Sequence, residues 1–269
     1  MEYTLITGAS GGIGKALAHQ LAARRHNLLL VARNADKLST LQRELTGKYQ
    51  TYVKIITADL SKPDAAQQLF VETQKQGLEI STLINNAGIG SSGEFTDISL
   101  SSEHSLLQLN IVSLVTLSHM YLGEMKKKRK GILINVASMT AFMPVPYMAT
   151  YAASKVFVRS FTEALTQEYK PYDIQVMLLS PGLTRTNFNE AAGLNSEKGN
   201  ALSSDYSTAS TQTPEEVATE TLKALDKNKH FHISGRKNRW GMRILALLPN
   251  KMITKFMADS YRKKTNQKL

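Results

Sequence analysis

A tyrosine and a lysine four positions apart are the residues whose types and spacing best suit proton transfer. In the run YAASK, a helix would place Tyr151 and Lys155 on one face, roughly 6 Å apart. A nearby ammonium stabilises a phenolate and lowers the tyrosine pKa from about 10, so the pair is a candidate general acid and base. The alternative is an exposed helix, because roughly one such pair is expected by chance.

The start of the chain supplies a more specific motif. A β-prone run, YTLIT, leads through TGASGGIG into a helix-prone segment. Gly8, Gly12 and Gly14 permit positive φ and let backbone N–H groups approach a pyrophosphate at the helix N-terminus. The spacing differs from the common G-x-G-x-x-G fingerprint. We predict a dinucleotide-phosphate turn; the alternative is a tight turn without a ligand.

The residue after the second apolar run discriminates between cofactors. This run, NLLLVA, is typical of a strand buried on both faces, and it ends at Arg33. NAD sites usually place an acidic residue here, whereas an arginine suits a 2′-phosphate. Asp36 is a rival, but an acidic residue in the first turn of a helix needs no ligand. The sequence favours NADP (NADPH), with Arg33 reading the phosphate and Lys37 assisting.

Strands and helices alternate along most of the chain. Five further runs are predicted strands: YVKIITADL, STLINNAG, GILINVAS, DIQVMLLS and HFHIS. This alternation predicts an α/β single-domain Rossmann fold, a doubly wound parallel sheet with helices on both faces. A long helix is expected from about Ser101 to Met125. Ligands should bind at the carboxyl ends of the strands, where each motif named so far falls.

Composition bounds the domain organisation. The 269 residues, 42% of them hydrophobic, fit one domain over residues 1–235 and a C-terminal helical extension over 236–269. The absence of cysteine excludes disulfides and thiolate metal sites. His230 and His232 lack neighbouring ligand candidates, so no metal site is expected. Without a signal-like segment or an apolar run of about 18 to 20 residues, we expect a cytoplasmic protein, with peripheral membrane contact left open.

Together these motifs resemble the short-chain dehydrogenase/reductase (SDR) family over residues 4–233, nearest to ketoacyl reductases and hydroxysteroid dehydrogenases. The matching features are TGASGGIG, Asp59, NNAG, Asn110, Ser138, YAASK and PGLTRT. The resemblance makes Tyr151 the general acid/base, Lys155 the residue that binds the nicotinamide ribose, and Ser138 the group that orients the substrate carbonyl. Asn110 matches the asparagine that holds a water in the proton relay, although a mid-helix asparagine is by itself more often a surface residue.

The resemblance also implies a cofactor site and an activity. The expected cofactor-binding residues are Gly8, Ser10, Gly12, Ile13, Gly14, Arg33, Asp59, Leu60, Asn86, Ala87, Gly88, Tyr151, Lys155, Pro181, Gly182 and Thr184. The implied reaction is NADPH-dependent reduction of a ketone or aldehyde, with a 3-oxoacyl thioester among the candidate substrates. Two alternatives stay open: a dehydrogenase of a hydroxysteroid or other secondary alcohol, and a non-catalytic NADP-binding regulatory protein.

Apolar residues between Ser138 and Tyr151 are candidates for the substrate cleft, with internal packing as an even alternative. They are Met139, Phe142, Met143, Tyr147 and Met148. An apolar carbonyl compound is therefore expected as substrate. The polar stretch at 183–213 is expected to form a mobile substrate lid.

The formal charge of +11 is concentrated at the C-terminus. Residues 229–269 hold seven lysines and four arginines against one acidic residue, Asp259. The remaining body is nearly neutral, so nucleic-acid binding is not expected. Two amphipathic basic helices are predicted on either side of Pro249. We expect them to cover the substrate cleft or a dimer partner, with a basic face that attracts an acyl carrier protein, coenzyme A or anionic lipid headgroups.

Self-association is also expected. The run VFVRSFTEAL offers more apolar positions than one side of a sheet needs. We predict a homo-oligomer, a dimer or tetramer, formed through the helix containing Tyr151 and the long helix before it. The run KKKRK at 126–130 is interpreted as a solvated connection rather than a binding patch.

Overall fold

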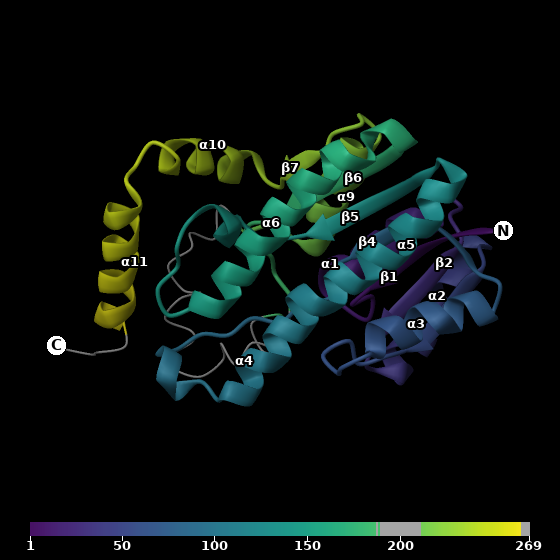
Figure 1. The fold of residues 1–269 in the computed structure, drawn as a ribbon, viewed down its shortest axis with the longest axis horizontal. Helices are drawn as coiled ribbons and strands as arrows, with labels where there is room; N and C mark the ends of the chain where they lie inside the picture. Colours follow the sequence, from purple (N-terminus) through teal and green to yellow (C-terminus); the bar gives the residue numbers. More distant parts are fainter. Residues whose placement is uncertain (187, 189–210, 265–269) are drawn as a thin grey trace.

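Parallel strands form one seven-stranded sheet in the computed structural model, which describes residues 1–186, 188 and 211–264 (Figure 1). The strands are β1 (Glu2–Thr7), β2 (Leu28–Ala32), β3 (Val53–Thr57), β4 (Glu79–Asn85), β5 (Gly131–Val136), β6 (Ile174–Ser180) and β7 (Phe231–Ile233). Their spatial order is β3-β2-β1-β4-β5-β6-β7. The strand runs predicted from the sequence are therefore confirmed.

Helices cover both faces of the sheet. They are α1 (Gly12–Ala23), α2 (Ala35–Tyr49), α3 (Ala65–Lys75), α4 (Leu100–Leu107), α5 (Leu114–Lys128), α6 (Ala149–Tyr169), α9 (Pro214–Leu225), α10 (Arg236–Leu245) and α11 (Asn250–Lys264). Residues of α1, α2 and α9 pack on one face, and residues of α3, α5 and α6 pack on the other (Figure 1).

Strand β2 explains this double covering. Leu28 and Leu30 belong to the core on the first face, while Leu29 and Val31 belong to the core on the second. Successive side chains of a strand point to opposite faces, so a continuously apolar strand must be covered twice. The predicted doubly wound α/β fold is confirmed. Because β2 and β4 flank β1 on opposite sides, the loops after β1 and β4 border the crevice where such folds bind ligands.

The stretch expected as one long helix over Ser101–Met125 is instead interrupted. A π-helical segment, Gln108–Ser113, lies between α4 and α5. The whole stretch Leu100–Lys128 is also long and apolar enough by composition to cross a membrane, contrary to the expectation from sequence. Within this stretch, Tyr121 and Leu122 are buried against the sheet, whereas Leu107 and Val112 are exposed.

The C-terminal arm, residues 236–269, contains α10 and α11, as its amphipathic pattern predicts (Figure 1). Ile253 and Tyr261 of α11 are buried, and the Tyr261 ring stacks on Tyr147 with centroids 3.7 Å apart. The arm thus packs beside the start of α6. Most of the expected lid, residues 187 and 189–210, lies outside the described residues.

Candidate active site

The loop after β1 is shaped for close approach of a phosphate-bearing ligand. Gly8 and Gly12 have φ values of 67° and 52°, a region that favours glycine. Gly14 does not share this conformation, contrary to the role expected from sequence. It lies within α1, and a Cβ there would come within 2.5 Å of the Gly8 carbonyl oxygen. Gly14 therefore lets α1 pack closely against the turn. The N-terminus of α1, next to this turn, favours an anion.

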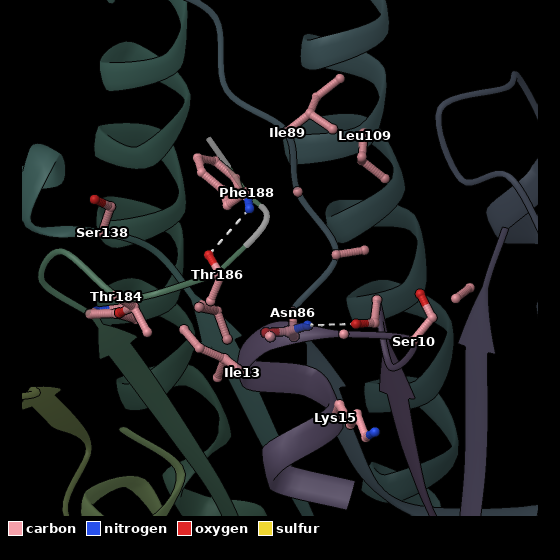
Figure 2. A pocket seen from close by; sticks show the side chains of 18 of the residues that line it. Ser10, Ile13, Lys15, Asn86, Ile89, Leu109, Ser138, Thr184, Thr186 and Phe188 are labelled. Carbon is pink, nitrogen blue, oxygen red and sulfur yellow. Dashed lines mark hydrogen bonds between the residues drawn. The ribbon is translucent and has the colours of Figure 1, made fainter. Parts of the chain in front are cut away.

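Asn86 ties the loop after β4 to the loop after β1. Its Nδ2 donates to the carbonyl oxygens of Thr7 and Gly8 at 2.9 and 3.3 Å. The Thr7 hydroxyl accepts from the Asn86 and Ala87 N–H groups at 3.0 and 2.9 Å. Asn86 therefore faces the same cavity as Ser10 and the glycine turn (Figure 2).

Two cationic side chains gather at the N-terminus of α2. Arg33 and Lys37 are exposed and line the cavity. Asn34 caps the helix, since its side chain accepts from the Lys37 N–H at 2.8 Å. The two charges and the positive end of the helix dipole together favour an anion at this place.

Asp59 and Leu60 follow β3 and line the cavity next to this cationic site. The Asp59 Oδ1 accepts from the Ser61 hydroxyl at 2.7 Å and from its N–H at 3.1 Å. Burial works to raise the pKa of Asp59, but the Ser61 hydrogen bonds and the charge of Arg33 outweigh it and lower that pKa. The Leu60 carbonyl is held by the Ser113 hydroxyl at 2.6 Å, which fixes the loop against the π-helical segment.

Tyr151 and Lys155 lie one turn apart on α6 and are 7% and 5% exposed. The Lys155 Nζ lies 5.8 Å from the Tyr151 ring centroid and donates to the Val136 carbonyl oxygen at 3.1 Å. Burial lowers the pKa of Lys155 to about 8. Burial also raises the pKa of the Tyr151 phenol, more than the Ser138 and Thr140 side chains lower it. The lowered tyrosine pKa expected from sequence is therefore wrong for the protein by itself, because desolvation dominates.

Asn110 is buried in the π-helical segment, not placed at a helix surface. Its Oδ1 accepts from the Ile89 N–H at 3.0 Å, and its Nδ2 donates to the Ile89 carbonyl and the Ser154 hydroxyl at 2.9 and 3.1 Å. Ser154 in turn donates to the Tyr151 carbonyl oxygen at 2.7 Å. Asn110 therefore links the loop after β4 to the backbone that carries Tyr151.

Ser138 stands where β5 gives way to a 3₁₀ turn, Met139–Phe142. Its hydroxyl accepts from the Thr140 N–H at 3.2 Å and caps this turn. The Met139 N–H donates to the Pro181 carbonyl oxygen at 3.0 Å, which joins the loops after β5 and β6. Ser138, Pro181 and Tyr151 all line the same cavity.

Gly182 lies against Asn238, a buried residue in the first turn of α10. A Cβ at position 182 would overlap the Asn238 amide. The Asn238 Nδ2 donates to the Ser234 carbonyl at 2.9 Å, and the Thr184 hydroxyl donates to the Gly182 carbonyl at 3.0 Å. Asn238 lines the cavity although no motif in the sequence marks it.

Thr186 and Phe188 are further lining residues that the sequence reasoning missed (Figure 2). A Cβ on Gly12 would come within 3.0 Å of the Thr186 methyl group, so this threonine packs against the glycine turn. The Phe188 ring lies 5.7 Å from the Tyr151 ring. Thr186 is the last residue of the run PGLTRT, and that motif could have marked it as a site residue. No motif in the sequence marks Phe188.

One cavity of about 980 Å³ joins these groups. All predicted catalytic and cofactor-binding residues line it except Gly14 and Asn110, which support it from behind. Of the apolar residues expected in the substrate cleft, Met139, Met143 and Met148 line the cavity. Phe142 instead packs against Arg159 and Phe231, and Tyr147 against Tyr261.

Comparison with known families decides where this chain belongs. The family model described as short chain dehydrogenase matches residues 2–197. The chain belongs to the short-chain dehydrogenase family. This short-chain dehydrogenase is 31% identical to a 7β-hydroxysteroid dehydrogenase of Mediterraneibacter gnavus over 240 residues, 88% of each chain.

Two Mus musculus relatives are longer. The chain is 36% identical to 17β-hydroxysteroid dehydrogenase type 3 over 183 residues, which are 67% of this chain and 59% of that protein. It is 32% identical to very-long-chain 3-oxoacyl-CoA reductase over 191 residues, 69% of this chain and 60% of that protein. The matched region thus spans less than two thirds of these relatives.

Solved structures of the family share the fold. A 7β-hydroxysteroid dehydrogenase structure has a TM-score of 0.83 at 28% identity, with 96% of each chain covered. A short-chain dehydrogenase from Sphingobium yanoikuyae in complex with NADPH has a TM-score of 0.79 at 28% identity, covering 93% of this chain and 97% of that one.

Proposed function

We propose that this short-chain dehydrogenase is an NADPH-dependent oxidoreductase that reduces an apolar ketone or aldehyde, with Tyr151 as the general acid. The observation that carries the proposal is the buried Tyr151–Lys155 pair at the wall of a cavity that extends to Arg33. A proton donor and a cleft of dinucleotide size thus meet in one cavity, which suits hydride transfer coupled to proton transfer.

The chain's own residues fit a dinucleotide with a 2′-phosphate. The positive-φ turn at Gly8 and Gly12 gives a pyrophosphate access to backbone N–H groups. Arg33 and Lys37 at the start of α2 match the charge of a 2′-phosphate. The NADPH complex of the Sphingobium relative supports the same choice. When bound, NADPH supplies the hydride that the carbonyl carbon accepts.

Tyr151 and Ser138 act on the carbonyl oxygen. As negative charge grows there, both hydroxyls donate hydrogen bonds, so stabilisation is concentrated on the transition state. Burial raises the pKa of Tyr151 and keeps the phenol protonated, as an acid requires. After the proton leaves, the Lys155 ammonium one turn away stabilises the phenolate. Asn110 holds this part of α6 in place through Ser154.

The substrate is proposed to be apolar. Three methionines, Met139, Met143 and Met148, line the cavity together with Phe188 and Leu183. Flexible thioether side chains adapt to apolar ligands of irregular shape. A relative that is a 3-oxoacyl-CoA reductase and others that are hydroxysteroid dehydrogenases make 3-oxoacyl thioesters and oxosteroids the first compounds to test.

Two alternative functions, an alcohol dehydrogenase and a non-catalytic NADP-binding protein, can be distinguished from a reductase by activity and binding measurements. A dehydrogenase would oxidise a hydroxysteroid or other secondary alcohol faster than it reduces the ketone at cellular cofactor ratios. A non-catalytic regulatory protein would bind NADP without turnover, although the intact set of Asn110, Ser138, Tyr151 and Lys155 argues against it.

The deciding experiment is a screen of NADPH oxidation over 3-oxoacyl thioesters, steroids, small diketones and aldehydes. The wild type should turn over at least one class, and the Tyr151→Phe variant should not. NADPH binding without turnover of any class would favour the regulatory alternative.

Self-association through α6 is part of the proposal. Val156 and Phe157 on α6 are 45% and 39% exposed, and Val112 on the neighbouring π-helical segment is 47% exposed. Adjacent exposed apolar side chains on two helices suit an isologous contact with a second copy. Light scattering should give a dimer or tetramer at micromolar concentration, and a strictly monomeric mass would contradict it.

The arm is proposed to contact an anionic membrane surface. Its exposed large apolar side chains are Trp240, Ile244, Leu247, Leu248, Met252 and Phe256. Exposed cations, including Lys237, Arg243, Lys251 and Lys255, lie between them. This combination suits an interfacial helix that presents apolar groups to acyl chains and cations to anionic headgroups. An acidic acyl carrier protein is the competing occupant.

A further inference from the structure

A second cavity of about 340 Å³ lies on the other side of a segment that lines the active site. Tyr147 and Ala149 line it, whereas Met148 between them lines the active-site cavity. Ala258 and Arg262 of α11 form another part of its wall. This volume lies within the range of small-molecule sites, and the site is complete only when the arm is packed in place.

Glu103 lines this cavity from the first turn of α4 and is 4% exposed. Neither carboxylate oxygen has a hydrogen-bond partner among the residues that the structure describes. An acidic residue in a first turn does interact favourably with the helix dipole, but that interaction leaves both oxygens unpaired. Buried carboxylates are normally paired, because desolvating an unpaired charge is costly. A ligand that enters the cavity and donates a hydrogen bond would therefore satisfy the Glu103 carboxylate.

The surrounding groups favour a cationic donor. Glu94 adds a second carboxylate to the lining, and the buried Ser91 hydroxyl also lacks a partner within the described residues. Phe95 and Tyr147 contribute aromatic rings, whose faces attract cations. In a protein of formal charge +11, this cavity is a local site of negative charge.

Arg262 also lines the cavity, but it is already engaged. Its Nε donates to the Tyr147 hydroxyl at 3.2 Å, and one of its terminal nitrogens pairs with Asp259 at 3.2 Å. The guanidinium thus fixes α11 to Tyr147, and no hydrogen bond joins it to Glu103 among the described residues. Tyr147 itself has a φ of 64° and is held by the Gly93 N–H, which donates to its carbonyl at 2.9 Å.

We propose that this second cavity binds a small organic ammonium whose nitrogen pairs with Glu103. Its alkyl part would contact the apolar lining, Ile98, Pro146 and Ala149. A metal ion fits less well, since the described residues contain no group of three histidine, cysteine or acidic side chains able to hold one. An anion is disfavoured by the two carboxylates. This site lies outside the reductase chemistry and needs no cofactor.

Titration calorimetry with n-butylammonium chloride tests the site directly. The wild type should bind the amine, whereas 1-butanol, which lacks the charge, should bind at least about tenfold more weakly. Glu103→Gln keeps the size and removes the charge, so its affinity for the amine should fall at least about tenfold. Glu124→Gln is the matched control, because that carboxylate pairs with Lys127 at the surface, and it should bind like the wild type.

A melting experiment separates a ligand site from a structural role. Without amine, Glu103→Gln should melt at or above the wild-type temperature, since it removes an unpaired buried charge. A drop in melting temperature would mean that Glu103 supports the fold and would overturn the proposal. Equal amine affinity in the wild type and Glu103→Gln would also overturn it, as would no binding by the wild type. Ala258→Leu, which reduces the cavity volume while keeping the carboxylate, should weaken binding as well.

Discussion

The ammonium nitrogen of Lys155 lies 5.8 Å from the Tyr151 ring centroid and is anchored to the Val136 carbonyl at the end of β5. The lysine is thus positioned by the sheet and the tyrosine by the helix. Because β5 and α6 pack together in the core, the distance between the two groups is fixed by the fold itself.

Tyr151→Phe should lower turnover by at least about 10², because it removes the acid while preserving the ring. NADPH affinity should change little, since the hydroxyl is a small part of a large cavity. Steady-state kinetics and a fluorescence titration with NADPH measure the two quantities. Near-normal reduction by this variant would refute the assigned mechanism.

Arg33→Ala should weaken NADPH binding by about 1.5–3 kcal/mol, the contribution of a charged hydrogen bond, and leave NADH binding nearly unchanged. Arg43→Ala is the control, since Arg43 lies on α2, the helix that follows Arg33, but does not line the cavity. Kd values for both cofactors provide the check. An equal loss for both would show that Arg33 does not read the 2′-phosphate.

Gly14→Ala should destabilise the protein by about 1–3 kcal/mol, because the new methyl group would meet the Gly8 carbonyl. Gly11→Ala is the matched control: its added Cβ has no atom within 4 Å, and its φ of −170° is open to any residue. Urea unfolding without cofactor compares the two variants. Similar midpoints would mean that the turn has room to relax.

Lys155 should make stability depend on pH between about 8 and 10. The pKa of Lys155 is about 8 in the folded protein and 10.5, the ordinary lysine value, in the unfolded chain. The unfolded chain therefore binds more protons in this pH window. The contribution of Lys155 to stability therefore rises with pH, by about 2.5 kcal/mol over two units. In urea unfolding, the stability of the wild type relative to Lys155→Met should be higher at pH 10 than at pH 8. A constant difference would contradict the lowered pKa.

The double variant Lys251→Glu with Lys255→Glu should bind anionic liposomes at least about tenfold more weakly than the wild type. Reversing two exposed lysines of the body, Lys48 and Lys75, should have a smaller effect. Co-sedimentation at low and high salt measures this, and binding should fall as salt rises. Salt-independent or absent liposome binding would leave an acyl carrier protein as the partner to test.

The sheet could be predicted from sequence because local signals agree with the global fold. The strands are short, mostly apolar runs, and the glycine motif, NNAG and Ser138 each follow one, where parallel strands end together. Tyr151 and Lys155 lie on α6 instead. The positions of Ser138, Asn86 and Gly182 on one cavity follow from that rule alone. The preference for NADP stays a prediction, which rests on Arg33 directly after β2.

Other features depend on contacts between distant residues, which no local pattern encodes. The π-helical segment QLNIVS contains neither proline nor glycine and continues the apolar period of its neighbours. The rise in the Tyr151 pKa comes from burial, which a spacing of four residues cannot reveal. The arm's pattern predicted helices, but which side chains stay exposed depends on how α11 meets Tyr147.

The contact between Gly182 and Asn238 limits how this chain can be recombined with its relatives. Asn238 belongs to the arm by sequence position, yet its amide fits against Gly182 in the loop after β6 and is held by Ser234. A chimaera that exchanged everything after residue 235 would place a foreign side chain in that space. The natural junction for grafting a new C-terminus therefore lies after Asn238, within the first turn of α10.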